Sequence, residues 1–260
     1  MRFSVRLGKP TFPCRTCKPS PSSIRSSRRA LRLTRVPGAL GKGERVWVMV
    51  RLHGDMEIAP GDTVARYLLL SNSHDGNSSV QVKFTPVRVV CQNTLNQALE
   101  MGPTLRIAHN REMQRRLGDT AEAIAEIRER FDELQMFFKK IVQVQMKTTS
   151  LESYLAAVFP EPNRGKDDKR YERALKQMKR DRIAAQQRFE TGKGNNLAHV
   201  RGTLWAAYNG VTEYVDYART TVGDSKWLDS VWFGEGCAIK TRACDLAVVA
   251  VNGSQAPAAL

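Results

Sequence analysis

The residues of this sequence that are most able to do chemistry stand in the segment 67–95, which reads YLLLSNSHDGNSSVQVKFTPVRVVCQNTL. A catalytic interpretation combines His74, Asp75 and Cys91 into one site, in which a base and a carboxylate activate a thiol. A structural interpretation assigns the same residues to a hairpin and a helix cap. Asp75-Gly76 is among the strongest short hairpin signals, because such turns need residues that accept positive φ. No His or carboxylate lies at a spacing that would activate Cys91, so we interpret it as a small buried apolar residue.

Acidic residues offer a second kind of chemistry, that of a metal-dependent nuclease. Glu213 and Asp216 stand three residues apart, which places two carboxylates on one helical face, and Mg²⁺ sites often use one or two carboxylates. Two acidic residues at this spacing are far more commonly solvated, so the nuclease is the lesser alternative. The other possible ligands in this interpretation are Asp55, Asp62, His74 and Asp75.

Cysteine spacing favours neither a metal nor a cofactor. Cys14-x-x-Cys17 has the local spacing of half a zinc site, but the sequence has no second C-x-x-C or H-x-x-x-H pair to complete it. We therefore expect no metal site and no cofactor. We assign no catalytic residue, and we favour a protein that is not an enzyme.

The charge of the chain is concentrated at its start. The formal net charge is +15 over 260 residues, and residues 1–40 contain ten Lys and Arg with no Asp or Glu. This segment is rich in Arg, Ser and Pro and has no sustained period, so we interpret residues 1–40 as a disordered or non-native basic segment. A truncated or frame-shifted start, a nucleic-acid-binding arm and a targeting peptide are the explanations that remain open. The other residues hold 31 basic and 26 acidic side chains, a much smaller excess.

The elements that must position these residues follow from hydrophobic periodicity and turn signals. Strands are expected over 44–52, 64–72 and 80–90, with Pro86 marking an edge or bulge in the last. Helices are expected over 95–101, from Thr120 to Ile141, and over 150–159, 169–190, 197–221 and a final segment before 251. This order predicts an α+β fold, with an antiparallel β-meander or hairpin followed by a mostly α-helical half. We expect one domain over 41–251 and a tail over 252–260. No apolar run is long enough to span a bilayer, so we expect a soluble protein with no membrane partner.

Basic residues near aromatic ones make nucleic acid the expected partner. Lys and Arg neutralise phosphates, and aromatic rings stack on bases. The sequence predicts an accessory nucleic-acid-binding protein, with single-stranded DNA as the candidate partner. For the basic helix 169–190, a simply solvated face is the alternative. The predicted binding residues are Lys83, Arg88, Arg170, Tyr171 and Arg188.

An apolar seam runs along the first long helix, with steps of three and four residues that are typical of a heptad pattern. Such a seam packs either on the domain's own core or against another subunit. The second alternative predicts a structural protein that forms homo-oligomers. The residues of the apolar seam are Ile124, Ile127, Phe131, Leu134, Phe138 and Ile141.

Four stretches of the sequence carry a resemblance to a known family. They are YLLLSNSHDG, FTPVRVVCQNTLNQAL, RGTLWAAYNGVTEYVDYART and FGEGCAIKTRA. Together they resemble the phage/plasmid-like family of unknown function, domain of unknown function 932, over roughly residues 44–251. For a nucleic-acid-binding protein we expect a role in single-strand handling or recombination. The resemblance implies a protein of a mobile element in the cytoplasm of a bacterial or phage-infected cell. It implies no particular activity. The family usually has a longer folded region before residue 41, which is why a truncated or frame-shifted start is expected here.

Overall fold

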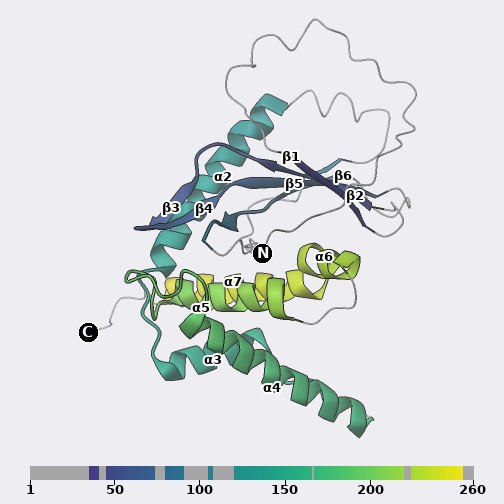
Figure 1. Ribbon diagram of the computed structural model, residues 1–260, viewed down its shortest axis with the longest axis vertical. Coiled ribbons are helices and arrows are strands. Elements are labelled where there is room, and N and C mark those ends of the chain that lie inside the picture. The colour runs from purple at the N-terminus through teal and green to yellow at the C-terminus, as the bar shows by residue number, and fades with distance from the viewer. Residues whose placement is uncertain are drawn as a thin grey trace, which may run out of the picture. The chain divides into compact units, whose positions relative to one another are not determined.

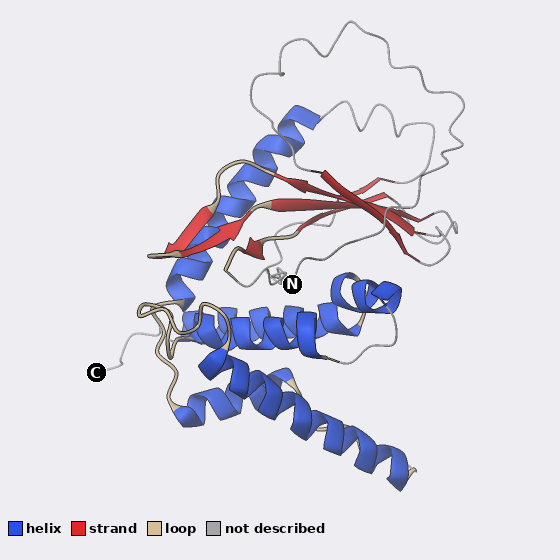
Figure 2. Ribbon diagram, viewed as in Figure 1, coloured by secondary structure: helices blue, strands red, loops and turns tan. Residues whose placement is uncertain are grey.

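The computed structural model describes residues 35–40, 45–73, 80–90, 105–107, 120–165, 167–219 and 224–253. All of them lie in one unit of the chain, Leu33–Leu260. Antiparallel strands come first and helices follow, so the predicted α+β class is confirmed (Figures 1 and 2). The expected hairpin apex at 74–79 and the expected helix at 95–101 lie outside the described residues.

Five strands form the larger sheet, in the order β1-β2-β5-β6-β8. Strand β5 pairs antiparallel with β6, which confirms the predicted hairpin. Strand β1 lies inside the segment for which the sequence predicted no regular structure, and its pairing with β2 extends the ordered region back to residue 35. The strands of this sheet are β1 (Arg35–Leu40), β2 (Arg45–Arg51), β5 (Tyr67–Ser73), β6 (Val80–Phe84) and β8 (Leu105–Ile107).

A smaller sheet has the order β3-β4-β7 and consists of β3 (Met56–Ala59), β4 (Asp62–Ala65) and β7 (Val87–Arg88). Two of the strands expected from the sequence are therefore divided between the sheets. The chain leaves the smaller sheet at Arg66 to continue as β5, and it leaves the larger sheet at Pro86 to continue as β7. Pro86 has no backbone N–H to donate to a ladder, which explains the second break.

Helices joined by turns and loops follow the strands in the described chain. They are α2 (Thr120–Ile141), α3 (Thr148–Val158), α4 (Asp168–Thr191), α5 (Leu204–Glu213), the π-helix η1 (Tyr214–Ala218), α6 (Asp224–Trp232) and α7 (Glu235–Gly253). None of the helices in the described part of the chain is long and apolar enough to cross a membrane.

The helix expected over 197–221 begins later than the sequence indicated. Gly202 has a φ of +75°, a conformation that ends any preceding helical run, and residues 197–202 form turns. Thr203 then caps α5, because its Oγ1 accepts a hydrogen bond from the Ala206 backbone N–H at 3.2 Å.

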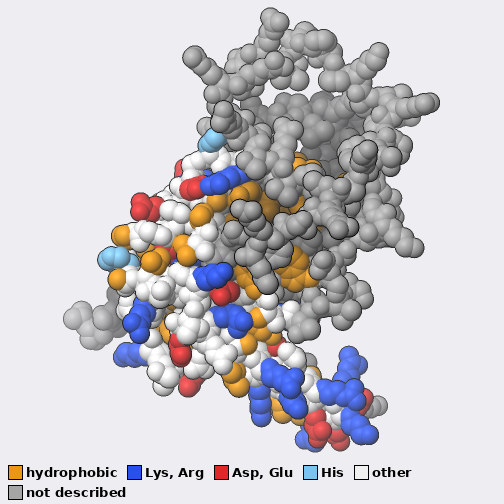
Figure 3. Space-filling model, in the orientation of Figure 1, with side chains coloured by type: hydrophobic (Ala, Val, Ile, Leu, Met, Phe, Trp, Pro, Cys, Tyr) orange, Lys and Arg blue, Asp and Glu red, His pale blue; other side chains and the backbone are white. Residues whose placement is uncertain are grey.

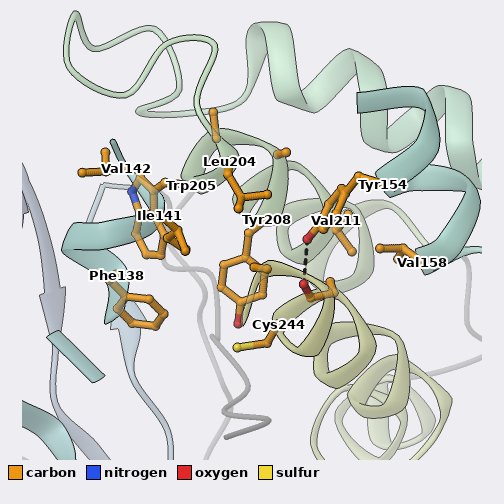
Figure 4. Packing of buried hydrophobic residues seen from close by; sticks show 14 of the residues in the cluster. Phe138, Ile141, Val142, Tyr154, Val158, Leu204, Trp205, Tyr208, Val211 and Cys244 are labelled. Carbon is orange, nitrogen blue, oxygen red and sulfur yellow. Dashed lines mark hydrogen bonds between the residues drawn. The ribbon is translucent and has the colours of Figure 1, made fainter. Parts of the chain in front are cut away.

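The main core lies where α2, α3, α5 and α7 meet the paired strands β3 and β4. Phe138 of α2 packs against Trp205 of α5, with 4.7 Å between the ring centroids. Tyr154 of α3 donates a hydrogen bond to the Ala243 carbonyl of α7 at 2.9 Å, as Figure 4 shows. A second, smaller cluster joins the larger sheet to α6 through Trp47 and other apolar side chains.

Helices α4 and α5 are in close contact at Gly210. A Cβ at this position would lie 2.8 Å from the Phe189 nitrogen and 2.9 Å from the Ala185 oxygen, both backbone atoms. We expect Gly210→Ala to lower the free energy of unfolding by about 1–3 kcal/mol, because a backbone cannot give way as a flexible side chain can. Urea denaturation measures this change. Gly253→Ala is the matched helical control, since no atom lies within 4 Å of that Cβ. Equal midpoints for the two variants would contradict the close contact.

Candidate nucleic-acid interface

Helix α4 has its buried residues in its middle and second half. It begins at a capped end, where the Asp167 side chain accepts a hydrogen bond from the Arg170 backbone N–H at 3.0 Å. Its buried residues are Met178, Asp181 and Ala185, which share one face. Asp181 accepts hydrogen bonds from the Tyr214 hydroxyl and from the Gln177 amide. Burial first, and then this hydrogen bond to Asp181, raises the pKa of Tyr214. These contacts fix α4 against η1.

Two of the basic residues of α4 are used inside the protein. Arg182 donates two hydrogen bonds to the Phe159 carbonyl, at 2.7 and 3.0 Å, at the C-terminal end of α3. Arg188 donates to the Ala184 carbonyl at 2.8 Å and lies over the Tyr214 ring, 5.7 Å from its centroid. Arg188 was predicted to bind nucleic acid, but the structure turns its guanidinium toward the protein.

The other basic residues of α4 are exposed, and four of them form a line that we call the basic stripe. Its members follow each other in steps of four, three and four residues, on the side of the helix opposite Met178. Within the part of the chain that the structure describes, none of the four forms an ion pair. Figure 3 shows Lys and Arg side chains gathered over the end of α4. The basic stripe consists of Lys169, Arg173, Lys176 and Arg180.

The basic stripe is electrostatically unfavourable in the isolated protein. Its neighbours lie at i,i+3 and i,i+4 spacing, where like charges destabilise a helix by about 0.2–0.5 kcal/mol per pair. Glu172, three residues after Lys169 and four before Lys176, offsets part of this repulsion, and the stripe keeps an excess of positive charge. A polyanion bound along it would relieve this repulsion.

The two binding residues predicted at the start of α4, Arg170 and Tyr171, differ in their exposure and contacts. Arg170 is exposed on the flank of the basic stripe. Tyr171 is half-buried, its hydroxyl donates to Glu161 at 2.9 Å, and the guanidinium of Arg164 lies 5.9 Å from its ring centroid. The hydrogen bond to Glu161 is the main cause that raises the pKa of Tyr171. Because Tyr171 has these partners, its ring is not a free surface for stacking on a base.

The prediction that Arg88 contacts a phosphate is corrected by its burial. Arg88 has no exposed surface, and its Nε and Nη2 donate to the Asp62 carboxylate at 2.6–3.0 Å. Its Nη1 donates to the Asn195 side-chain oxygen at 2.8 Å. All of these partners lie inside the molecule. The remaining predicted residue, Lys83, lies on β6, and its side chain is outside the described residues.

The described acidic residues of the nuclease alternative do not come together in one site. Asp216 is buried and forms an ion pair with Lys240 at 2.8 Å, whereas Glu213 accepts a hydrogen bond from the Lys193 backbone N–H at 3.2 Å. Asp62 is occupied by Arg88. Among the described residues, no three His, Cys, Asp or Glu side chains are grouped so that they could hold a metal ion. His74, Asp75 and Cys91 lie outside the described residues.

The apolar seam is buried within the chain wherever it is described. Phe131, Leu134, Phe138 and Ile141 are at most 1% exposed and belong to the main core. The side chains of Ile124 and Ile127 lie outside the described residues. Assembly through this seam stays a prediction, and its four described members already have partners in their own chain.

The residues of the basic stripe were not among the predicted binding residues. Arg170 and Arg188 were predicted because each precedes an aromatic residue, and Lys83 and Arg88 because they are basic residues of an expected strand. The signal that identifies the basic stripe is instead the period of the charges, because steps of four, three and four place side chains on one helical face.

An α+β domain with an exposed basic helix is the class that the fold and the site define. The family model described as domain of unknown function (DUF932) matches residues 28–242. This match covers most of the sequence, and the chain belongs to this family. It includes β1 and all of α4, so the basic stripe lies within the family domain. No curated protein and no solved structure matches the chain.

Proposed function

We propose that this chain is an accessory nucleic-acid-binding protein that holds its partner by the phosphate backbone, through the basic stripe of α4. The observation that supports the proposal is the line of four exposed basic side chains with no ion pair among the described residues. A setting in a phage, plasmid or other mobile element, and a role in recombination, are parts of the same proposal. The setting is supported by the family resemblance, and the role in recombination is proposed from nucleic-acid binding in that setting.

Phosphate binding at such a site is driven largely by the release of counterions. The stripe extends over about 16 Å of helix, at 1.5 Å per residue. Each phosphate that a basic side chain neutralises contributes about 0.9 to the salt dependence of binding to duplex DNA and about 0.7 for a single strand. Affinity that rests on these contacts must therefore fall steeply as salt rises.

Replacing all four residues of the basic stripe by Gln is expected to abolish most of the binding. The slope of log K against log salt should fall by about 3–4, which corresponds to four lost phosphate contacts. Gln has nearly the helix propensity of Lys and Arg, so α4 should persist, and circular dichroism checks this. Fluorescence anisotropy with labelled DNA between about 50 and 200 mM salt measures the slope.

A matched control removes the same number of charges elsewhere. Lys139, Lys140, Lys147 and Arg201 are exposed and lie outside α4. Their replacement by Gln should leave most of the salt slope in place. The proposal fails if the parent chain binds no nucleic acid at low salt, or if the two quadruple variants bind equally.

A further inference from the structure

We infer that the partner of α4 is B-form duplex DNA and that the first half of the helix enters the major groove. This inference rests on the proposed function and adds the form of nucleic acid that the site takes. Duplex DNA replaces the single strand that the sequence predicted, and the inference depends on shape and on the distribution of charge around the helix.

The first half of α4 is accessible on most of its circumference. Of the buried residues of the helix, Met178 lies at the end of the first half, and Asp181 and Ala185 lie in the second half. Earlier in the first half, Tyr171 and Leu175 are half-buried on the same side as Met178. In the first half, the exposed residues include Lys169, Arg173 and Lys176. Figure 1 shows this end of α4 extending away from α5 and α7. An α-helix with its side chains is roughly 10–12 Å across, and the major groove of B-form DNA is about 12 Å wide.

Positive charge is present on both flanks of α4 as well as on the basic stripe. At about 100° per residue, Arg170 lies about 100° to one side of Lys169, and Lys179 lies about 80° to the other side. Both side chains are exposed, and neither forms an ion pair with a described residue. The exposed carboxylates of Asp168 and Glu172 lie on the same flank as Lys179, so the positive charge of that flank comes from Lys179 alone. A groove has a wall of phosphates on each side, so a helix inside it needs basic residues on both flanks. A single strand presents one line of phosphates, for which the basic stripe alone would suffice.

The loop between α3 and α4 (residues 159–167) contacts the first half of α4 and leaves the basic stripe exposed. It contacts Tyr171, which points away from the basic stripe, about 200° around the helix from Lys169, and its Arg164 forms an exposed ion pair with Asp168 at 3.7 Å. The other aromatic residue of α4, Phe189, is half-buried and packs against the main core. Neither ring on α4 is placed to stack on unpaired bases, which is the main source of affinity for single strands beyond charge.

Binding to duplex RNA distinguishes a helix that enters the major groove from a helix that is attracted only by the charge of the phosphates. A-form RNA carries the same kind of backbone charge, but its major groove is deep and narrow and does not admit side chains in the same way. A helix that requires the groove must therefore prefer DNA. A helix that only lies along phosphates has no such requirement.

The test uses the full chain with three labelled probes of about two helical turns: duplex DNA, duplex RNA and single-stranded DNA. We expect duplex DNA to bind about tenfold more tightly than either other probe at equal salt. The flank variant Arg170→Gln/Lys179→Gln should reduce the salt slope on duplex DNA by about 2 and leave the slope on the single strand nearly unchanged. Lys139→Gln/Lys140→Gln is its two-charge control.

The outcomes separate this inference from the proposed function. Equal affinity for the two duplexes, tighter binding of the single strand, or a flank variant that behaves like its control would overturn entry into the groove. In each of these cases the basic stripe could still bind phosphates. Absence of binding to all three probes would instead reject the proposed function itself.

Discussion

Replacing Asp62 by Asn is expected to lower the free energy of unfolding by about 3–5 kcal/mol, because it leaves the guanidinium of Arg88 buried without a counter-ion. Both side chains of this ion pair have 0% exposure. The Asp62 carboxylate also accepts a hydrogen bond from Trp205 Nε1 at 2.8 Å. Removing one member of a buried, fully bonded pair forces the other to stay charged without compensation or to rearrange the core.

The Asp62 network joins parts of the chain that are far apart in sequence. Arg88 of β7 donates to the Gly194 carbonyl at 3.0 Å, and the Asn195 side-chain nitrogen donates to the Ala206 carbonyl of α5 at 3.0 Å. The small sheet is thereby tied to the turn between α4 and α5. Loss of Asp62 should weaken this connection and the placement of α4 together.

Thermal and urea denaturation measure the effect of Asp62→Asn. For a chain of this size, about 3–5 kcal/mol corresponds to a fall in Tm of roughly 10 °C. Asp55→Asn is the matched control, because Asp55 pairs with Arg51 at the same 2.6 Å distance but with side chains 34% and 42% exposed. Exposed pairs contribute about 0–1 kcal/mol. Similar losses of stability for the two variants would contradict the account of the buried network.

Replacing Lys240 by Met is expected to produce the second large loss of stability, also about 3–5 kcal/mol. Lys240 of α7 is 0% exposed, and its Nζ lies 2.8 Å from Asp216, whose side chain is 3% exposed. Asp216 lies in η1, and its backbone carbonyl accepts a hydrogen bond from Trp227 Nε1 at 2.7 Å. Met fills a similar volume but supplies no charge, so the carboxylate of Asp216 loses its cation.

A surface ion pair on the same helix provides the control for Lys240→Met. Glu235, also in α7, lies 2.6 Å from Arg219, and its side chain is 71% exposed. Glu235→Gln should therefore change the free energy of unfolding by less than about 1 kcal/mol. Urea denaturation of both variants makes the comparison. An equal loss of stability in Glu235→Gln and Lys240→Met would contradict the argument that burial makes the Lys240–Asp216 ion pair the more important one.

Local signals in the sequence were sufficient for the class of the fold and for most of its elements. β-Branched runs identified β2 and β6, and turn residues identified the hairpin of β5 with β6. Apolar periods identified α2 and α4, and a capping pattern identified α3. These features depend on neighbours within a few residues. That is why the order of strands before helices could be predicted.

Features that depend on distant contacts could not be predicted. The burial of Arg88 requires Asp62 and Asn195, which are 26 and 107 residues away, so a basic residue that looked available on a strand is internal. The division of the strands between two sheets has the same origin, because it reflects which strand each segment finds as a partner. At α4, the spacing of the charges places the basic stripe on one face, and the buried residues on the opposite face show that the stripe points outward.

The reactivity of lysines with and without DNA tests the binding surface most directly. The full chain is labelled by reductive methylation at low salt, alone and then saturated with duplex or single-stranded DNA, and mass spectrometry gives the extent at each lysine. The account predicts that DNA protects Lys169, Lys176 and Lys179 of α4. The exposed lysines Lys139, Lys140 and Lys147 should react as before. Protection of the second group with unchanged reactivity on α4, or no protection by either DNA, would contradict it.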